Sequence, residues 1–302
     1  MPWVFVLIWS TGFVVARLAM PHSPPFAFLS WRFALSTLCF FAWIALARAR
    51  WPASRAQWGH LAVTGVLMQA GYLGGVWSAV RAGIGAGTVA LLVGLQPVLT
   101  ALWVTRSGAG RGAVAVGPAV SSRQWIGLVL GFVGLALVVW PKLGTGEVTP
   151  TNLALATVAL LSITIGTLYQ KRHIEPCDVR TASFVQMLAA LVVSVPLALV
   201  EPGAMDWHPN LVAAMAWSVG VLTLGGSSLL YLLIQRGEAT AVTSLLYLVP
   251  PTTALMAWVL FGESFTPVMM LGMAVTVVAV AIVVRSPGGS QSRSTPVEEI
   301  PG

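Results

Sequence analysis

The sequence predicts an all-α integral membrane protein whose ten transmembrane helices form an inverted repeat of five plus five, with both termini in the cytoplasm. Three observations lead to this prediction. Of the 302 residues, 57% are hydrophobic and only 8% are charged, whereas soluble proteins carry about 25% charged residues. The apolar residues also gather in segments of spanning length. Finally, the first half of the sequence is echoed in the second.

Ten apolar segments follow one another along the chain, and each is long enough to cross a hydrocarbon core of roughly 30 Å as a helix. The tail after Arg285 is polar and rich in Pro, Gly and Ser, so we expect it to be disordered. The chain thus divides into residues 1–140, residues 141–285 and the tail 286–302. The predicted spans are 3–20, 26–47, 57–80, 83–105, 124–140, 151–170, 180–200, 209–235, 239–261 and 266–285.

The repeat is visible at a separation of 155 residues. The stretch from Arg81 to Trp103 matches the stretch from Arg236 to Trp258, so that Arg falls on Arg, Thr on Thr and Trp on Trp. Since each half holds an odd number of spans, the second half enters the membrane upside down relative to the first. Inverted repeats of this kind are typical of secondary transporters.

The positive residues predict the orientation. Of the 16 Lys and Arg residues, twelve fall in the tail or in loops on the side of the N-terminus, and four fall on the other side. Because cytoplasmic loops carry the excess of positive charge, both termini are expected in the cytoplasm. Arg17 is among the four exceptions, and the sequence offers no account of its place.

Each half carries prolines at matching depth inside a span, namely Pro97 in the first half and Pro250 with Pro251 in the second. Proline removes a helical hydrogen bond, and a matched pair of interrupted spans is the best sequence pointer to a transporter binding site near the midplane. The alternative is that these prolines only bend helices for packing.

Polar and aromatic side chains inside the spans predict an uncharged central cavity. No Asp or Glu lies deep in a span, so the usual proton relay or cation ligand of a pump is absent from the sequence. The alternative is that these side chains hydrogen-bond neighbouring helices, each pair worth about 0.6 kcal/mol. The predicted lining of the cavity is Trp9, Gln69, Tyr72, Trp77, Gln96, Ser227, Ser228, Tyr231, Thr243 and Tyr247.

Arg32 is expected to be a structural charge. It lies about six residues inside the second span, where an unpaired charge costs up to roughly 3 kcal/mol. Its counterpart at a separation of 154 is the neutral Gln186, so a symmetric role in binding a ligand is not expected.

The sequence contains no phosphate-binding loop of the G-x-x-x-x-G-K-[ST] type, and its four histidines lack metal-ligand spacing. Cys39 and Cys177 are expected to be free thiols. We therefore expect no catalytic residue, no metal and no cofactor. The net charge of +7 concerns orientation in the lipid bilayer, and nucleic acid is not an expected partner. The Gly71-x-x-x-Gly75 pattern predicts close helix packing within one chain, so a monomer is expected, with a dimer as the alternative.

The sequence resembles the EamA family of the drug/metabolite transporter superfamily. The resemblance rests on the opening Trp9-Ser-Thr-Gly12, on Trp31-Arg32-Phe33, and on the block from Arg236 to Gly262-Glu263. The first half has Thr105-Arg106 where the second has Gly-Glu, so its copy departs from the family pattern. Within the family, the chain is most similar to bacterial exporters of aromatic amino acids.

The resemblance implies secondary transport across the bacterial inner membrane. We expect export of small neutral metabolites, namely aromatic or other apolar amino acids, by alternating access through the uncharged cavity. A carrier of another small metabolite, such as a nucleobase or nucleoside, is the first alternative. A membrane-embedded enzyme is the second, although the sequence shows no nucleophile–base pair or metal cluster for it.

Overall fold

The computed structural model describes residues 2–107, 122–143, 145–226, 229, 248–263 and 266–284, and all regular structure in these ranges is helical. The prediction of an all-helical protein is therefore confirmed. In chain order the elements are α1 (Pro2–Ala19), α2 (Pro25–Ala47), α3 (Arg55–Gly65), η1 (Val66–Gly71), α4 (Tyr72–Arg81), α5 (Ala86–Val93), α6 (Gln96–Ser107), α7 (Ser122–Leu143), α8 (Pro150–His173), α9 (Val179–Val200), α10 (Pro209–Ala216), η2 (Trp217–Gly225), α13 (Val249–Phe261) and α14 (Pro267–Val284).

Among the described helices, α3, α8 and α9 begin at a residue whose side-chain oxygen caps the first turn. The side chain of Thr149 accepts a hydrogen bond from the N–H of Asn152, and the Asn152 side chain accepts one from the N–H of Thr149, which makes a reciprocal cap for α8. Ser54 and Asp178 cap α3 and α9 in the simpler way, through their side-chain oxygens. These caps satisfy backbone donors that the first helical turn leaves without partners.

Several helices are long and apolar enough to cross a membrane. Four of them satisfy both criteria over Pro25–Ala47, Trp125–Leu143, Pro150–His173 and Val179–Val200. Shorter apolar helices, among them α13, are also present. Large hydrophobic side chains remain exposed on the outside of the bundle, for instance Leu46 and Leu199, which is typical of a surface that faces lipid.

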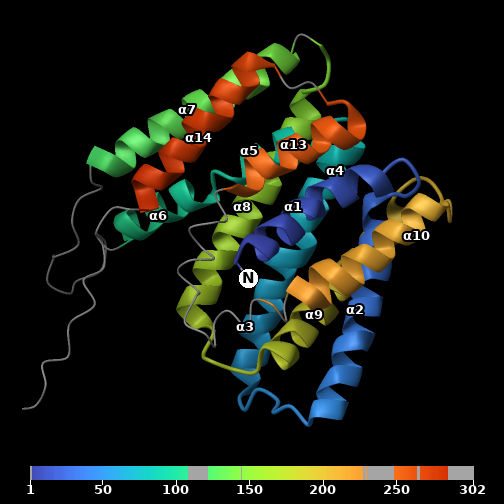
Figure 1. The fold of residues 1–302 in the computed structure, drawn as a ribbon. Helices are drawn as coiled ribbons and strands as arrows, with labels where there is room; N and C mark the ends of the chain where they lie inside the picture. Colours follow the sequence, from blue (N-terminus) through green and yellow to red (C-terminus); the bar gives the residue numbers. More distant parts are fainter. Residues whose placement is uncertain are drawn as a thin grey trace, which may run out of the picture.

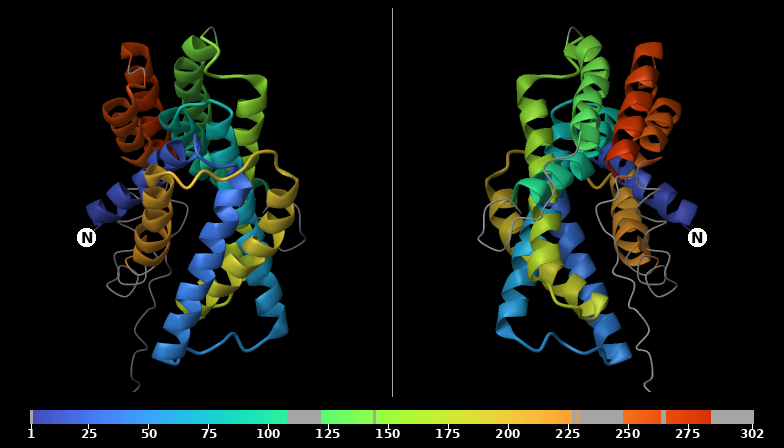
Figure 2. Two further views of the ribbon diagram at one scale, coloured as in Figure 1. Left: turned by 90° about the vertical axis from the view of Figure 1, so that its right-hand side faces the viewer. Right: turned by 90° about the vertical axis from the view of Figure 1, so that its left-hand side faces the viewer.

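Helices from the two ends of the sequence pack against each other in pairs. The closest pairs are α7 with α14, α2 and α3 with α9, α4 with α8, and α5 with α13. The α7/α14 pair and the α2/α9 pair lie on opposite sides of the molecule (Figures 1 and 2). The remaining pairs lie between them, so the middle of the bundle is built from early and late helices together.

Glycines bring the backbones of these pairs together. A Cβ added to Gly65 of α3 would lie 2.4 Å from the backbone oxygen of Gln186 on α9. One added to Gly75 of α4 would lie 2.8 Å from the backbone oxygen of Leu155 on α8. The Gly71-x-x-x-Gly75 pattern thus serves close packing between helices of one chain, as the sequence predicted.

Two of the spanning helices contain a π-helical segment. The α3–η1–α4 helix runs without a break from Arg55 to Arg81, and the α10–η2 helix runs from Pro209 to Gly225. Adding 155 to the bounds of η1 gives 221–226, which overlaps η2. Such segments widen the helix locally and are frequent at functional sites.

The predicted prolines stand at helix starts. The fourth span is broken at Gly94 and Leu95, and Pro97 lies in the first turn of α6. Pro250 and Pro251 likewise lie in the first turn of α13. In a first turn the missing N–H costs nothing, because that group has no helical partner there. In the first half the helix is therefore broken at Gly94 and Leu95, before Pro97, and Pro97 does not kink a continuous helix.

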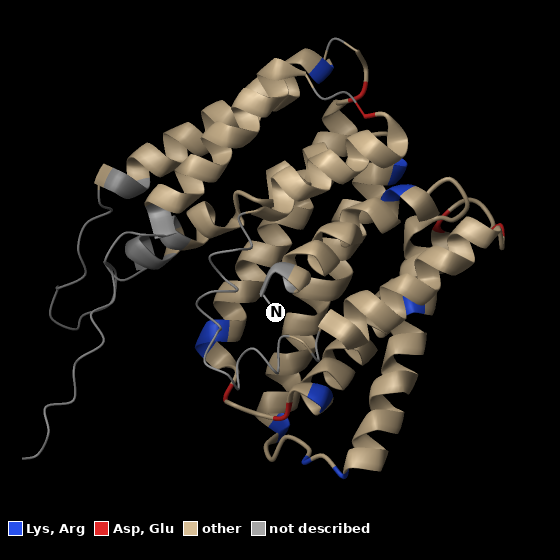
Figure 3. Ribbon diagram, viewed as in Figure 1, with Lys and Arg blue, Asp and Glu red and all other residues tan. Residues whose placement is uncertain are grey.

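Charged residues gather at the two ends of the bundle (Figure 3). At one end α2 and α9 are joined by the hydrogen bond from Thr181 Oγ1 to the backbone oxygen of Arg50, and we call it the basic end. The opposite end is richer in acids. The basic end carries Arg48, Arg50, Arg55, Lys171, Arg172 and Arg180 with Glu175 and Asp178, and the opposite end carries Arg17, Arg81 and Lys142 with Glu147, Glu201, Asp206 and Glu263.

Candidate functional site

Two members of the predicted cavity lining lie in the packed core. Trp77 is 1% exposed and stacks on Phe28 with ring centroids 4.5 Å apart. Tyr72 is buried where η1 meets α4, within electrostatic range of the Arg32 guanidinium. Trp77 therefore packs inside the first half, whereas Tyr72 lies beside the buried charge.

The other described members of the lining lie on separate helices. Gln96 opens α6, and its Nε2 donates a hydrogen bond of 2.9 Å to Thr167 Oγ1 on α8. Trp9 of α1 is 39% exposed, and Gln69 is half-buried within η1. The second-half members Ser227, Ser228, Tyr231, Thr243 and Tyr247 lie outside the described residues.

Arg32 is 7% exposed and lies between α2 and the π segment η2. Its Nη2 donates a hydrogen bond of 3.3 Å to Thr223 Oγ1, and Thr223 Oγ1 in turn donates one of 2.9 Å to the backbone oxygen of Ser218. Within the described ranges Arg32 has no carboxylate partner. Its hydrogen bond thus ties a helix of the first half to a helix of the second.

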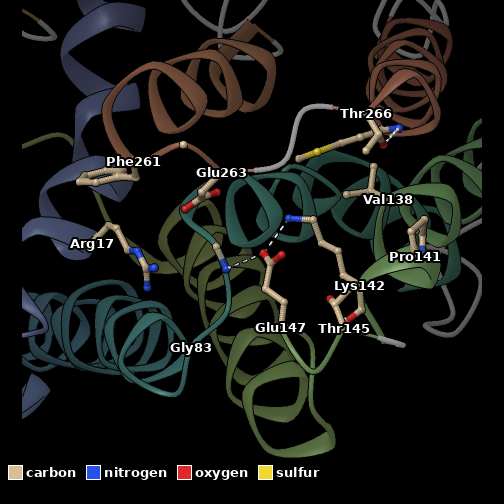
Figure 4. A pocket seen from close by; sticks show the side chains of 13 residues that line it. Arg17, Gly83, Val138, Pro141, Lys142, Thr145, Glu147, Phe261, Glu263 and Thr266 are labelled. Carbon is tan, nitrogen blue, oxygen red and sulfur yellow. Dashed lines mark hydrogen bonds and ion pairs between the residues drawn. The ribbon is translucent and has the colours of Figure 1, made fainter.

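A cavity of about 460 Å³ opens at the end of the bundle opposite the basic end (Figure 4). It lies where α1, the α4–α5 turn, α7 and the C-terminal end of α13 meet. Both charged and apolar side chains reach it. The lining is Arg17, Gly83, Gly85, Val138, Pro141, Lys142, Thr145, Glu147, Phe261, Gly262, Glu263, Thr266 and Met269.

The Glu263 carboxylate holds the N-terminal end of α5. Gly262 ends α13 in the left-handed conformation with a φ of 65°, which suits glycine. Glu263 then accepts a hydrogen bond of 2.9 Å from the N–H of Ala86 and one of 3.4 Å from the N–H of Gly87. A carboxylate is stabilised at this position because free N–H groups and the positive end of the helix dipole face it.

Glu147 holds the residue before α5. Its Oε1 accepts a hydrogen bond of 3.3 Å from the N–H of Gly85 and pairs with Lys142 Nζ at 2.6 Å. Lys142 is only 4% exposed, so this ion pair neutralises a buried charge. A Cβ on Gly85 would lie 2.5 Å from Glu263 Oε2 and 2.7 Å from Glu147 Oε1, so a side chain there would displace one or both carboxylates.

A third acid at the same end joins the halves in a similar way. The Glu201 carboxylate accepts hydrogen bonds of 2.8 Å and 3.3 Å from the N–H groups of Phe26 and Ala27, at the start of α2. Burial raises the pKa of this carboxyl, and the two backbone hydrogen bonds oppose the shift.

The sequence pointed to the midplane and missed this cavity. Two signals for it were present. Arg17 departed from the positive-inside pattern, and Glu263 follows directly on the glycine that ends a span. Neither signal shows by itself that the two residues, far apart in the chain, line one cavity. Among the described residues, no group of three or more His, Cys, Asp or Glu is arranged to hold a metal ion.

Comparison with known proteins gives a consistent picture. The sequence profile of the EamA-like transporter family matches residues 3–140 and again residues 151–285. The inner membrane transporter YedA of Escherichia coli strain K12 is 25% identical over 283 residues, which cover 92% of this chain and 87% of YedA. The "Probable amino-acid metabolite efflux pump" of Salmonella typhimurium strain LT2 is 23% identical, over 88% of each chain.

Further relatives agree with these. The transporter YvbV of Bacillus subtilis strain 168 is 23% identical over 92% of this chain and 88% of its own length. One solved crystal structure overlays on the chain with a TM-score of 0.63 at 18% identity, and it covers 93% of this chain and 95% of the other. At that identity the likeness shows the fold alone.

Proposed function

The chain belongs to the EamA-like transporter family, and from that membership we propose that it is a secondary transporter that exports small neutral metabolites. That it is a multi-pass transporter of the bacterial inner membrane, and not an enzyme, follows from the family and from the names of its relatives. The proposal concerns its substrate, its mechanism and its orientation.

The proposed architecture is ten spans in two inverted halves. It is supported by the separate matches of the family profile to 3–140 and 151–285, and by the helix pairs that join early and late spans. The overlap of η1 with η2 at a separation of 155 residues supports it further. Alternating access then corresponds to rocking of one half against the other around a site between them.

The proposed orientation places the basic end in the cytoplasm. Among the residues that the structure describes, six basic and two acidic residues gather there, against three basic and four acidic residues at the opposite end. Because the positive residues stay on the cytoplasmic side, the cavity lined by Arg17 and Glu263 opens to the outside. In this orientation both termini are cytoplasmic.

The proposed substrates are amino acids with aromatic or other apolar side chains. The sequence feature that carries this proposal is the predicted central cavity, whose lining includes amide and hydroxyl groups such as Gln69, Gln96 and Ser227 but no carboxylate. Such a lining suits a solute without net charge. The amino-acid efflux pump among the relatives supports the same class, and a nucleobase or nucleoside is the alternative.

Uptake into proteoliposomes tests the proposal. Vesicles preloaded with unlabelled phenylalanine should take up labelled phenylalanine by exchange, with a rate that saturates, and the solute should be recovered unchanged. Vesicles without protein provide the control. Saturable uptake of adenine or uridine with none of any neutral amino acid would support the alternative, and chemical conversion of the solute would contradict a transporter.

A further inference from the structure

The external cavity contains two opposite charges that lack an ionic partner. Lys142 and Glu147 neutralise each other at 2.6 Å. The Glu263 carboxylate accepts only backbone N–H groups. Arg17 is half-buried and has neither a hydrogen bond nor an ion pair with any residue in the described ranges. Arg17 and Glu263 therefore face the same cavity (Figure 4), each without an ionic partner among the residues that the structure describes.

The charges of the cavity sum to zero, because two basic and two acidic side chains line it. A net ion would leave one charge of the complex uncompensated in a partly buried place, which is unfavourable. A dipolar solute avoids this cost, since each of its charges meets an opposite one. Arg17 presents a planar set of donors suited to a carboxylate, and Glu263 presents acceptors suited to an ammonium group.

The remaining wall of the cavity is apolar. Phe261 and Met269 reach it from the second half and Val138 from α7. The volume of about 460 Å³ falls within the range of about 300–1,000 Å³ that is typical of small-molecule sites. A solute with an apolar side chain in addition to its two charges fits this combination of wall and charge.

We propose that this cavity is a binding site for the zwitterion of an apolar α-amino acid, with the carboxylate on Arg17 and the ammonium on Glu263. The inference rests on the proposed function and adds to it a second subsite, on the external side, where the solute binds as it leaves. The ammonium would compete with Ala86 and Gly87 for Glu263. Occupancy would thereby loosen the contact between α13 and α5.

Protection of a thiol inside the cavity tests the inference. Thr145 lines the cavity and is exposed, so the substitution Thr145→Cys, made in a full-length chain that also carries Cys39→Ala and Cys177→Ala, reports on this site alone. The measured quantity is the rate at which a maleimide labels the introduced thiol in nanodiscs. Phenylalanine should slow this labelling in a saturable way.

Charge deletions in the protein are then matched to charge deletions in the solute. Arg17→Gln and Glu263→Gln should each raise the half-protecting concentration of phenylalanine by about tenfold, the loss expected for one charged hydrogen bond. Phenylalaninamide, which lacks the carboxylate, should lose protection in the parent chain and lose nothing more in Arg17→Gln. N-acetylphenylalanine lacks the ammonium. It should protect less than phenylalanine in the parent chain, and the substitution Glu263→Gln should weaken its protection no further.

Two controls keep the result specific. Lys171→Gln, at the basic end, should leave protection unchanged, and Arg17→Lys should restore part of it. Equal protection in Arg17→Gln and in the parent chain would overturn the inference. So would absence of protection in a parent chain that exchanges phenylalanine in liposomes, which would leave the proposed function standing. Protection without any exchange would instead support the site and contradict the proposed function.

Discussion

The Glu263 carboxylate accepts a hydrogen bond of 2.9 Å from the backbone N–H of Ala86, a residue 177 positions earlier in the chain. This bond joins the end of α13 to the start of α5. It gives a physical meaning to the Gly262-Glu263 pair, because the left-handed glycine ends one helix and the acid that follows caps another. The first half has no acid at the place that corresponds to Glu263, so nothing there can act in the same way.

Replacing Glu263 separates its role as hydrogen-bond acceptor from its charge. Glu263→Ala leaves the N–H of Ala86 without this partner, so we expect a loss of about 1 kcal/mol, the usual cost of removing a cap. Glu263→Gln keeps an acceptor oxygen and should lose less. The measurement is the midpoint of thermal unfolding in detergent, followed by circular dichroism. Glu175→Ala, an exposed acid at the basic end, is the control. Equal shifts in all three variants would contradict the capping role.

The contact between α3 and α9 depends on the absence of a side chain at Gly65. Gly65→Ala would bring a Cβ to 2.4 Å from the backbone oxygen of Gln186, and backbone cannot yield as a side chain can. We expect a loss of about 1–3 kcal/mol, as for other overpacked sites. Gly59→Ala in the same helix meets nothing within 4 Å, and alanine favours a helix over glycine by about 1 kcal/mol. The unfolding midpoint should therefore fall for the first variant and not for the second. A fall of equal size in both would contradict the packing role of Gly65, because helix propensity alone would raise both midpoints.

Glu201 and Asp178 should give the protein opposite responses to acid. Burial raises the pKa of Glu201, so its contribution to stability is full below the pKa of the unfolded chain and is lost as the pH rises through the folded pKa. Hydrogen bonding from Arg180 lowers the pKa of Asp178. Its contribution is present above the unfolded pKa and is lost as the pH falls through the folded pKa.

Comparison with Glu201→Gln and Asp178→Asn isolates each group, because the amides do not titrate. As the pH is lowered from about 7 to about 4, around the ordinary carboxyl range, the unfolding midpoint of the unchanged protein should rise relative to Glu201→Gln. It should fall relative to Asp178→Asn. Two differences of the same sign would contradict the assigned environments.

The sequence was sufficient for the all-helical fold because the signal for helices is local. Runs of apolar residues mark the helices, and no tertiary information is needed to read them. Close packing at Gly75 was also predicted, since small residues at helical spacing permit close approach. The pairing of early with late helices was not predicted, because it depends on the packing of the whole bundle.

What the sequence did not predict depends on contacts between distant residues. Nothing local in Arg17 or Glu263 indicates a common cavity, because their meeting requires the packing of α1, α5 and α13. The π segments were missed for a similar reason, since an i+5 hydrogen-bonding pattern leaves no periodic signature over so few residues. Trp77 was assigned to the lining, and the structure packs it against Phe28. The position of a tryptophan along a helix does not distinguish a residue that lines a cavity from one that packs in the core.

The proposed orientation makes Gly203 external. It lies between Glu201 and Asp206, in a loop without Lys or Arg, whereas the loops of the basic end carry most of the positive charge. A cysteine introduced at Gly203, with Cys39 and Cys177 replaced by alanine, should react with a membrane-impermeant maleimide added to intact cells. A cysteine introduced at Ala53, in the loop before α3, is the matched control and should react only after the membrane is opened. The reverse pattern would invert the topology.

Arg32 is expected to have a structural role, and this role must be distinguished from binding of the substrate. Its long side chain fills a buried place between α2 and η2 and bonds to Thr223. Arg32→Ala leaves a cavity and breaks this link, so we expect the yield of folded protein to fall several-fold. Arg32→Met keeps most of the volume without the charge, and it should recover much of the yield, because apolar replacements of buried charges are often tolerated.

Binding distinguishes this structural role from recognition of a substrate. In both variants the folded fraction, isolated by size-exclusion chromatography, should bind phenylalanine with an affinity within about twofold of that of the unchanged protein. Loss of an interaction worth about 1.4 kcal/mol would instead weaken binding about tenfold. Gln186→Ala, at the neutral position that corresponds to Arg32 in the second half, serves as the control for yield and for affinity. Normal yield of Arg32→Met with phenylalanine binding abolished would reassign Arg32 to the binding site. In that case the buried guanidinium would be held without a carboxylate partner because the substrate supplies one.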